Sequence, residues 1–75
     1  MITLIQIQEK LVETIKQSGM SQTALAEKIG VKQPTISHYI KGDKMPALDT
    51  FANLCAILDV DTNDILCVDD ERKER

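Results

Sequence analysis

The sequence predicts an all-α protein, folded as a compact five-helix bundle. Apolar residues recur at the three- and four-residue spacing of helices, and Ser, Thr, Asp, Gly or Pro stands where the helical patterns begin or end. No strand is predicted in any part of the sequence. Of the 75 residues 43% are hydrophobic, yet only Phe51 and Tyr39 are aromatic, so we expect a core of Leu, Ile, Val and Ala. A single core of this size is marginally stable, which favours a partner subunit.

The first helix is expected directly after Thr3. The Thr3 hydroxyl suits the N-cap and Gln6 lies three residues later, as in a capping box, while Gly19 ends the segment. Helical spacing then places one apolar stripe toward the core, formed by Leu4, Ile7, Leu11 and Ile15, with Val12 beside it.

A second helix is predicted from about residue 22 to residue 29. Ser21 suits its N-cap, and Gly30 suits a left-handed exit because glycine has no Cβ. Ala26 is expected where this helix crosses the next one, since a larger side chain would hold the two axes apart. The expected core of the two helices and their turn consists of Leu25, Ala26, Ile29, Gly30, Val31, Ile36 and Tyr39.

A third helix is predicted to open at Lys32 or Gln33 and to end at Gly42. Pro34 is tolerated there because first-turn amides have no intrahelical partner. The outward face of this helix is expected to carry Gln33, Pro34, Ser37, His38 and Lys41. Two short helices joined in this way predict a helix-turn-helix, in which one helix crosses the phosphate backbone of DNA and the other enters the major groove. Glutamine can donate to and accept from one adenine edge, and lysine can reach guanine or phosphate.

The rest of the chain predicts two further helices and a charged tail. A helix from about residue 48 to residue 58 has an expected apolar face of Leu48, Phe51, Ala52, Cys55 and Leu58. Asp61 is expected to cap a short helix that continues through Leu66. Residues 1–68 are expected to form one domain, whereas residues 69–75, DDERKER, contain no apolar residue and are expected to be disordered.

Charge is unevenly distributed along the chain. The formal net charge is −3, but residues 20–46 carry four lysines against Glu27 and Asp43, which gives +2. Residues 47–75 carry eight acidic residues against three basic ones, which gives −5. Because salt screens charges beyond about 8 to 10 Å, the local field decides whether phosphate is attracted. The acidic total therefore does not exclude a nucleic-acid partner.

Residues 20–66 resemble the phage repressor and Cro family, also called Xre-like regulators. The resemblance is carried by SQTALAEKIGVKQPTIS, then KGDKMPALDTF, then LCAILDVDTNDIL. It implies a lambda-repressor-like DNA-binding domain with the helix-turn-helix as its second and third helices, which works as a homodimer on a two-fold operator in double-stranded DNA. It also implies a sequence-specific transcriptional regulator, with repression as the default.

The resemblance implies roles for individual residues as well. The base-reading positions match Gln33, Pro34 and His38, with Ser37 beside them. Backbone contacts are expected from Ser21, Gln22, Lys32, Thr35, Lys41 and Lys44. Pro34 departs from the family pattern because it has no amide donor and offers only an apolar edge, suited to a thymine methyl group. His38 departs too, since a longer polar side chain is frequent at its position.

Two interpretations, completion of the monomer core or a dimer seam, are open for the apolar residues near the termini, Ile2, Ile5, Ile65 and Val68. Cys55 and Cys67 lie among apolar residues outside any CxxC spacing, which favours free buried thiols over a disulfide or a metal site. His38 is the only histidine and no cysteine lies within a turn of it, so we expect no metal.

An enzyme is not expected, because one histidine, no glycine-rich phosphate loop and no paired acids leave little for catalysis, and no cofactor is implied. The main alternative to a DNA-binding regulator is an antitoxin or anti-regulator, which would use the same fold to bind a partner protein. No apolar run of about 20 residues is present, so we expect a cytoplasmic protein without membrane contact. Since no ligand-sensing domain follows Leu66, switching is expected from concentration, operator competition or a separate regulatory protein.

Overall fold

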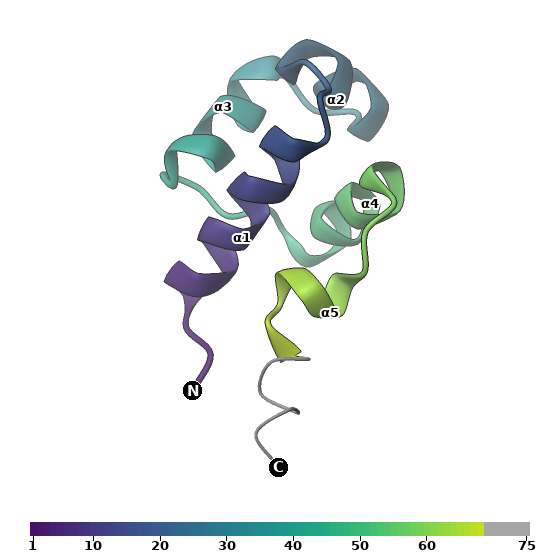
Figure 1. Ribbon diagram of the computed structural model, residues 1–75. Helices are drawn as coiled ribbons and strands as arrows, with labels where there is room; N and C mark the ends of the chain where they lie inside the picture. The colour runs from purple at the N-terminus through teal and green to yellow at the C-terminus, as the bar shows by residue number, and fades with distance from the viewer. Residues whose placement is uncertain (69–75) are drawn as a thin grey trace.

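Five helices follow one another in the computed structural model, which describes residues 1–68. They are α1 (Leu4–Gln17), α2 (Gln22–Ile29), α3 (Gln33–Lys41), α4 (Leu48–Leu58) and α5 (Thr62–Ile65). Helix α2 packs against α3 and α4, while α1 packs against α3 and α5 (Figure 1). The all-α, five-helix prediction is confirmed, and the charged segment 69–75 lies outside the described residues.

Side-chain caps begin three of the helices where the sequence places them. The Thr3 hydroxyl oxygen accepts from the Gln6 amide at 3.2 Å, and Gln6 Oε1 accepts from the Thr3 amide at 2.8 Å, which completes the capping box of α1. Ser21 Oγ accepts from the Ala24 amide at 3.1 Å, and an Asp61 carboxylate oxygen accepts from the Asn63 amide at 2.9 Å. These bonds satisfy amides that the helices themselves leave unpaired.

A single cluster of side chains from all five helices forms the core. Its buried members are Leu11, Ile15, Leu25, Ala26, Ile36, Tyr39, Phe51, Leu54, Cys55 and Ile65. Ile7, Ile29, Val31 and Leu58 pack against this cluster while half-buried. Aliphatic side chains thus supply most of the interior, as the composition predicts.

The predicted apolar faces of α1 and α4 are wrong at their ends. Leu4 is 70% exposed and Leu48 is 83% exposed, because each lies in the first turn of its helix, beyond the buried cluster. On α4 the fully buried residue is Leu54, which we did not expect, while Ala52 is exposed. The buried face of α4 is therefore formed by Phe51, Leu54 and Cys55, and it is turned toward Leu54 and away from Ala52, compared with the predicted face.

The four apolar residues near the termini differ in how deeply they are buried. Ile65 is 1% exposed and belongs to the monomer core, which favours the first of the two open interpretations for this residue. The reason is that α5 lies against α1, which covers this side chain. Ile2 and Val68 are half-buried, and Ile5 is 68% exposed. Among the described residues, no helix combines the length and the apolar content that crossing a bilayer requires.

A pair of isoleucine substitutions measures how much the core contributes to stability. Ile36→Ala should lower the free energy of unfolding by about 2 to 5 kcal/mol, because Ile36 is fully buried and its loss leaves a cavity between α3 and its neighbours. Ile5→Ala is the matched control and should change the same quantity by less than about 0.5 kcal/mol. Urea unfolding followed by circular dichroism gives both values, and equal losses would contradict the assigned core.

Candidate nucleic-acid interface

The turn between α2 and α3 is closed by one backbone carbonyl. The amides of Gly30 and Val31 both donate to the carbonyl oxygen of Ala26, at 2.9 and 3.0 Å. Gly30 has a φ of +87°, a left-handed conformation that glycine adopts without a Cβ clash. The Ala26 side chain is buried, and its small size lets the two helices approach closely. The chain therefore leaves α2 and enters α3 within three residues.

Helix α3 has a buried face and an exposed face. Ile36 and Tyr39 are buried, whereas Gln33, Pro34, His38 and Lys41 are exposed. Thr35 and Ser37 are half-buried at the boundary. Pro34 lies in the first turn, where its missing amide costs no helical hydrogen bond. The structure thus brings the predicted base-reading residues together along one side of α3.

Two glutamines join the starts of α2 and α3. Gln33 Nε2 donates to Gln22 Oε1 at 2.6 Å, although the residues are eleven positions apart. The contact leaves Gln33 with its carbonyl oxygen and a second amide hydrogen, and leaves Gln22 with its whole NH₂ group. Sequence reasoning assigned both residues to DNA but missed the bond between them. It depends on the angle between the two helices, which no local pattern reveals.

His38 has an acidic neighbour that the sequence analysis did not single out. Its Nδ1 lies 3.4 Å from Asp43 Oδ2, with both side chains more than half exposed. Gly42, at a φ of +83°, ends α3 and turns the chain so that the Asp43 amide donates to the His38 carbonyl. The i, i+5 spacing is the only signal that could have paired the two residues. Asp43 thus places one negative charge beside the last turn of the exposed face.

Lysines border the same face. Lys32 precedes α3, Lys41 ends it and Lys44 follows it, and all three side chains are exposed. None of them forms an ion pair with another of the residues that the structure describes. At the start of α2, the Ser21 oxygen caps the helix while its hydroxyl hydrogen stays available for donation. Donors and positive charges therefore lie at both ends of the exposed α3 face.

A sequence model of one family, described as helix-turn-helix, matches residues 11–65. The match extends from the middle of α1 through the end of α5 and includes the α2–turn–α3 unit. The chain belongs to the helix-turn-helix family. It is a DNA-binding transcriptional regulator of the Xre/Cro-like type, as the resemblance implied. No curated protein and no solved structure matches the chain.

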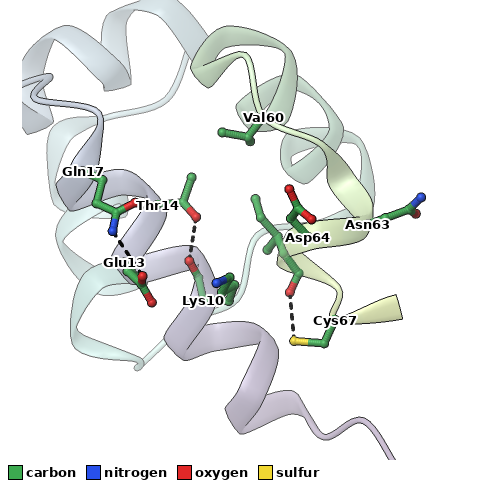
Figure 2. Close-up of a pocket in the computed structure, with 9 residues that line it drawn as sticks. Lys10, Glu13, Thr14, Gln17, Val60, Asn63, Asp64 and Cys67 are labelled. Carbon is green, nitrogen blue, oxygen red and sulfur yellow. Dashed lines mark hydrogen bonds between the residues drawn. The ribbon is translucent and has the colours of Figure 1, made fainter. Parts of the chain in front are cut away.

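The regulator also has a polar hollow of about 240 Å³ between α1 and α5 (Figure 2). Its hydrogen bonds are local: the Thr14 hydroxyl donates to the Lys10 carbonyl at 2.8 Å, and Gln17 Nε2 donates to Glu13 Oε1 at 3.1 Å. Each of these two bonds joins residues one turn apart on α1. The hollow takes no part in the α2–α3 face.

The two cysteines of the regulator are free thiols in the structure. Cys55 is buried on α4, as expected, whereas Cys67 is half-buried and donates weakly to the Ile65 carbonyl across 3.6 Å (Figure 2). The expectation of two buried thiols is therefore right for Cys55 and wrong for Cys67, because Cys67 lies beyond α5 at the edge of the hollow.

Tyr39 is buried on the core side of α3. Burial raises the pKa of its phenol above the ordinary value of 10.0, and the negative charge of Asp49 raises it further. The neutral phenol is therefore the form that the folded protein favours. The corresponding stabilisation is present below pH 10 and is lost as the pH rises through the pKa of the folded state, because only the unfolded chain ionises readily there.

Alkaline titration of the single tyrosine tests this environment. The phenolate absorbance of the folded protein should rise at a higher pH than that of the protein in urea, and Tyr39→Phe should reduce the loss of stability above pH 10. Because the chain has only one tyrosine, the absorbance reports this group alone. Coincident titration curves for the folded and unfolded chains would contradict the assignment.

Proposed function

We propose that this regulator represses transcription by binding a two-fold operator in duplex DNA as a homodimer. The observation that carries the proposal is the Gln22–Gln33 bond at the exposed start of the α2–α3 unit. It holds two polar side chains together, and each keeps unused hydrogen-bonding groups. The lysines that border this face form no ion pair with any residue from 1 to 68. Base contact and phosphate contact both need such groups.

Gln33 is assigned to a base edge. Its free carbonyl oxygen and remaining amide hydrogen match the N6 donor and N7 acceptor of adenine, a pair that only the major groove presents together. The bond to Gln22 limits the rotation of the Gln33 amide, so less side-chain entropy is lost when the base is bound. Pro34 offers an apolar surface to a thymine methyl group, while Ser37 and His38 extend the reading face by one turn.

The phosphate contacts are assigned to groups around this face. Gln22 retains its NH₂ donors, Ser21 retains its hydroxyl hydrogen, and the first amides of α2 have no intrahelical partner. The flanking residues Lys32, Thr35, Lys41 and Lys44 complete the backbone set. Contacts of this kind position the protein on DNA without reading its sequence. They also make the affinity depend on salt, because each neutralised phosphate releases counterions.

Dimerisation gives the regulator its operator geometry. Two copies related by a two-fold axis would place their α3 helices in successive major grooves about 34 Å apart. The second copy doubles the contacts, and the linkage of two half-sites raises the affinity beyond that of one monomer. Occupation of a promoter by such a dimer blocks polymerase. The occupancy is set by protein concentration, operator competition or a separate regulatory protein.

Substitution of Gln33 tests base reading. On an operator selected from a random duplex pool, Gln33→Ala should lose about 1 to 3 kcal/mol of binding free energy, with a much smaller loss on random duplex. Fluorescence anisotropy with both duplexes measures the difference. Gln22→Ala should weaken both complexes, and the double variant should show coupling because the two side chains share a hydrogen bond.

Equal losses on the two duplexes would remove Gln33 from the base-reading set. A protein that selects no duplex at all, but captures a partner protein, would instead support the antitoxin or anti-regulator interpretation. The two outcomes can be distinguished because the selection uses the wild-type protein and is completed before any variant is measured.

Substitution of Lys44 tests phosphate contact. Lys44→Ala should weaken binding to operator and to random duplex alike, and should flatten the slope of log affinity against log salt by about 0.9 for one lost contact. Lys10→Ala is the matched control, because this exposed lysine lines the hollow between α1 and α5, which contains no residue of α2 or α3. An unchanged slope for Lys44→Ala would remove it from the backbone set.

A further inference from the structure

We propose that the polar hollow between α1 and α5 binds a small amino acid that carries a second ammonium group. The hollow, called here the α1–α5 hollow, is lined by Lys10, Glu13, Thr14, Gln17, Val60, Asn63, Asp64, Ile65 and Cys67. No residue of α2 or α3 lines it, so a ligand there leaves the exposed face of α3 uncovered. A small-molecule site of this kind goes beyond the proposed function and does not depend on it.

The volume of the α1–α5 hollow suits a small metabolite. A cavity of about 150 Å³ is enough to hold benzene, which has six carbon atoms. On the same scale the hollow, with about 240 Å³, has room for about ten non-hydrogen atoms. Pockets for drug-sized ligands begin at about 300 Å³. A free amino acid with a long side chain therefore fits the hollow, whereas a nucleotide is too large.

Charged side chains of both signs line the α1–α5 hollow. Lys10 and Glu13 lie on its α1 side and Asp64 lies on its α5 side (Figure 2). All three residues are exposed, and none of them forms an ion pair with any residue from 1 to 68. Their charges therefore do not neutralise one another, and each is available to a ligand group of opposite charge.

The balance of these charges indicates the class of ligand. Lys10 offers one ammonium group, which attracts a carboxylate, whereas Glu13 and Asp64 offer two carboxylates, which attract ammonium groups. Glu13 Oε1 already accepts from Gln17 Nε2 at 3.1 Å, which leaves the second carboxylate oxygen for the ligand. One positive and two negative charges give the lining a net charge of −1. An amino acid with two ammonium groups and one carboxylate complements it.

Neutral side chains suit the uncharged part of such a ligand. Val60 and Ile65 contribute apolar surface to the lining, against which methylene groups can pack. The Thr14 hydroxyl donates to the Lys10 carbonyl at 2.8 Å, so its oxygen is still able to accept from an ammonium group. The α1–α5 hollow thus offers a partner for each part of an amino acid with a second ammonium group.

The backbone is strained on both sides of α5, beside the same hollow. Cys67 lines the hollow and has a φ of +63°, a left-handed conformation that is uncommon for residues with a Cβ. Within residues 1–68 the other non-glycine residue with a positive φ is Asp59, at +54°, directly before Val60 of the lining. Residues held in such conformations cluster at ligand sites. The backbone therefore supports the hollow as a site independently of its charges.

Calorimetric titration of the full chain with free L-lysine tests the α1–α5 hollow. L-Lysine should bind with a dissociation constant below about 1 mM. Cadaverine, which lacks the carboxylate, and norleucine, which lacks the second ammonium group, should each bind at least about tenfold more weakly. Asp64→Asn should weaken L-lysine binding at least about tenfold, because the amide keeps the size of the carboxylate and loses its charge. Asp49→Asn is the matched control, since this exposed first-turn aspartate does not line the hollow, and it should change the constant less than about twofold.

Amide chemical shifts of isotope-labelled protein locate the ligand. L-Lysine should shift the amides of residues that line the hollow, such as Thr14, Asp64 and Cys67, more than any others. Circular dichroism verifies that both asparagine variants fold. The assignment would be overturned by a dissociation constant above about 1 mM, by equal effects of the two variants, by cadaverine or norleucine binding as tightly as L-lysine, or by larger shifts elsewhere. A protein that binds L-lysine but selects no duplex would refute the proposed function and leave the α1–α5 hollow standing.

Discussion

The double hydrogen bond to the Ala26 carbonyl is the contact on which the arrangement of this regulator depends. The Ala26 carbonyl oxygen accepts from the amides of both Gly30 and Val31. Helix α2 therefore ends here, and the chain reverses before another turn can form. The left-handed Gly30 permits that reversal, and the small Ala26 side chain permits close packing behind it. If α2 continued by even one residue, α3 would start in another direction and its exposed face would turn with it.

The rotation of α3 follows from what it buries. Ile36 and Tyr39 occupy the core, so the residues on the opposite side are presented to solvent as a set. The same packing brings Gln33 within hydrogen-bonding distance of Gln22. Core packing and the polar face are thus two results of one helix orientation. Leu4 and Leu48 remain exposed because α1 and α4 begin beyond the core.

Sequence patterns predicted the helices better than they predicted exposure. The caps at Thr3, Ser21 and Asp61 each join residues two or three positions apart, so spacing was sufficient to find them. The predicted burial is wrong at Leu48, which lies in an exposed first turn. For Ile65 the sequence left core and surface open, and the structure places it under α1. Helical spacing predicts which residues share a face of a helix. It does not predict how far along that face a neighbouring helix extends.

The sequence by itself determined the five helices, their caps, the glycine turn and the family, because these depend on hydrogen bonds and spacings within a few residues. Only the tertiary structure decided the Gln22–Gln33 bond, the burial of Ile65 and the exposure of Leu48. Each of these depends on where separate helices meet in space. The angle and offset of packed helices arise from the interlocking of many side chains at once, which no single segment encodes.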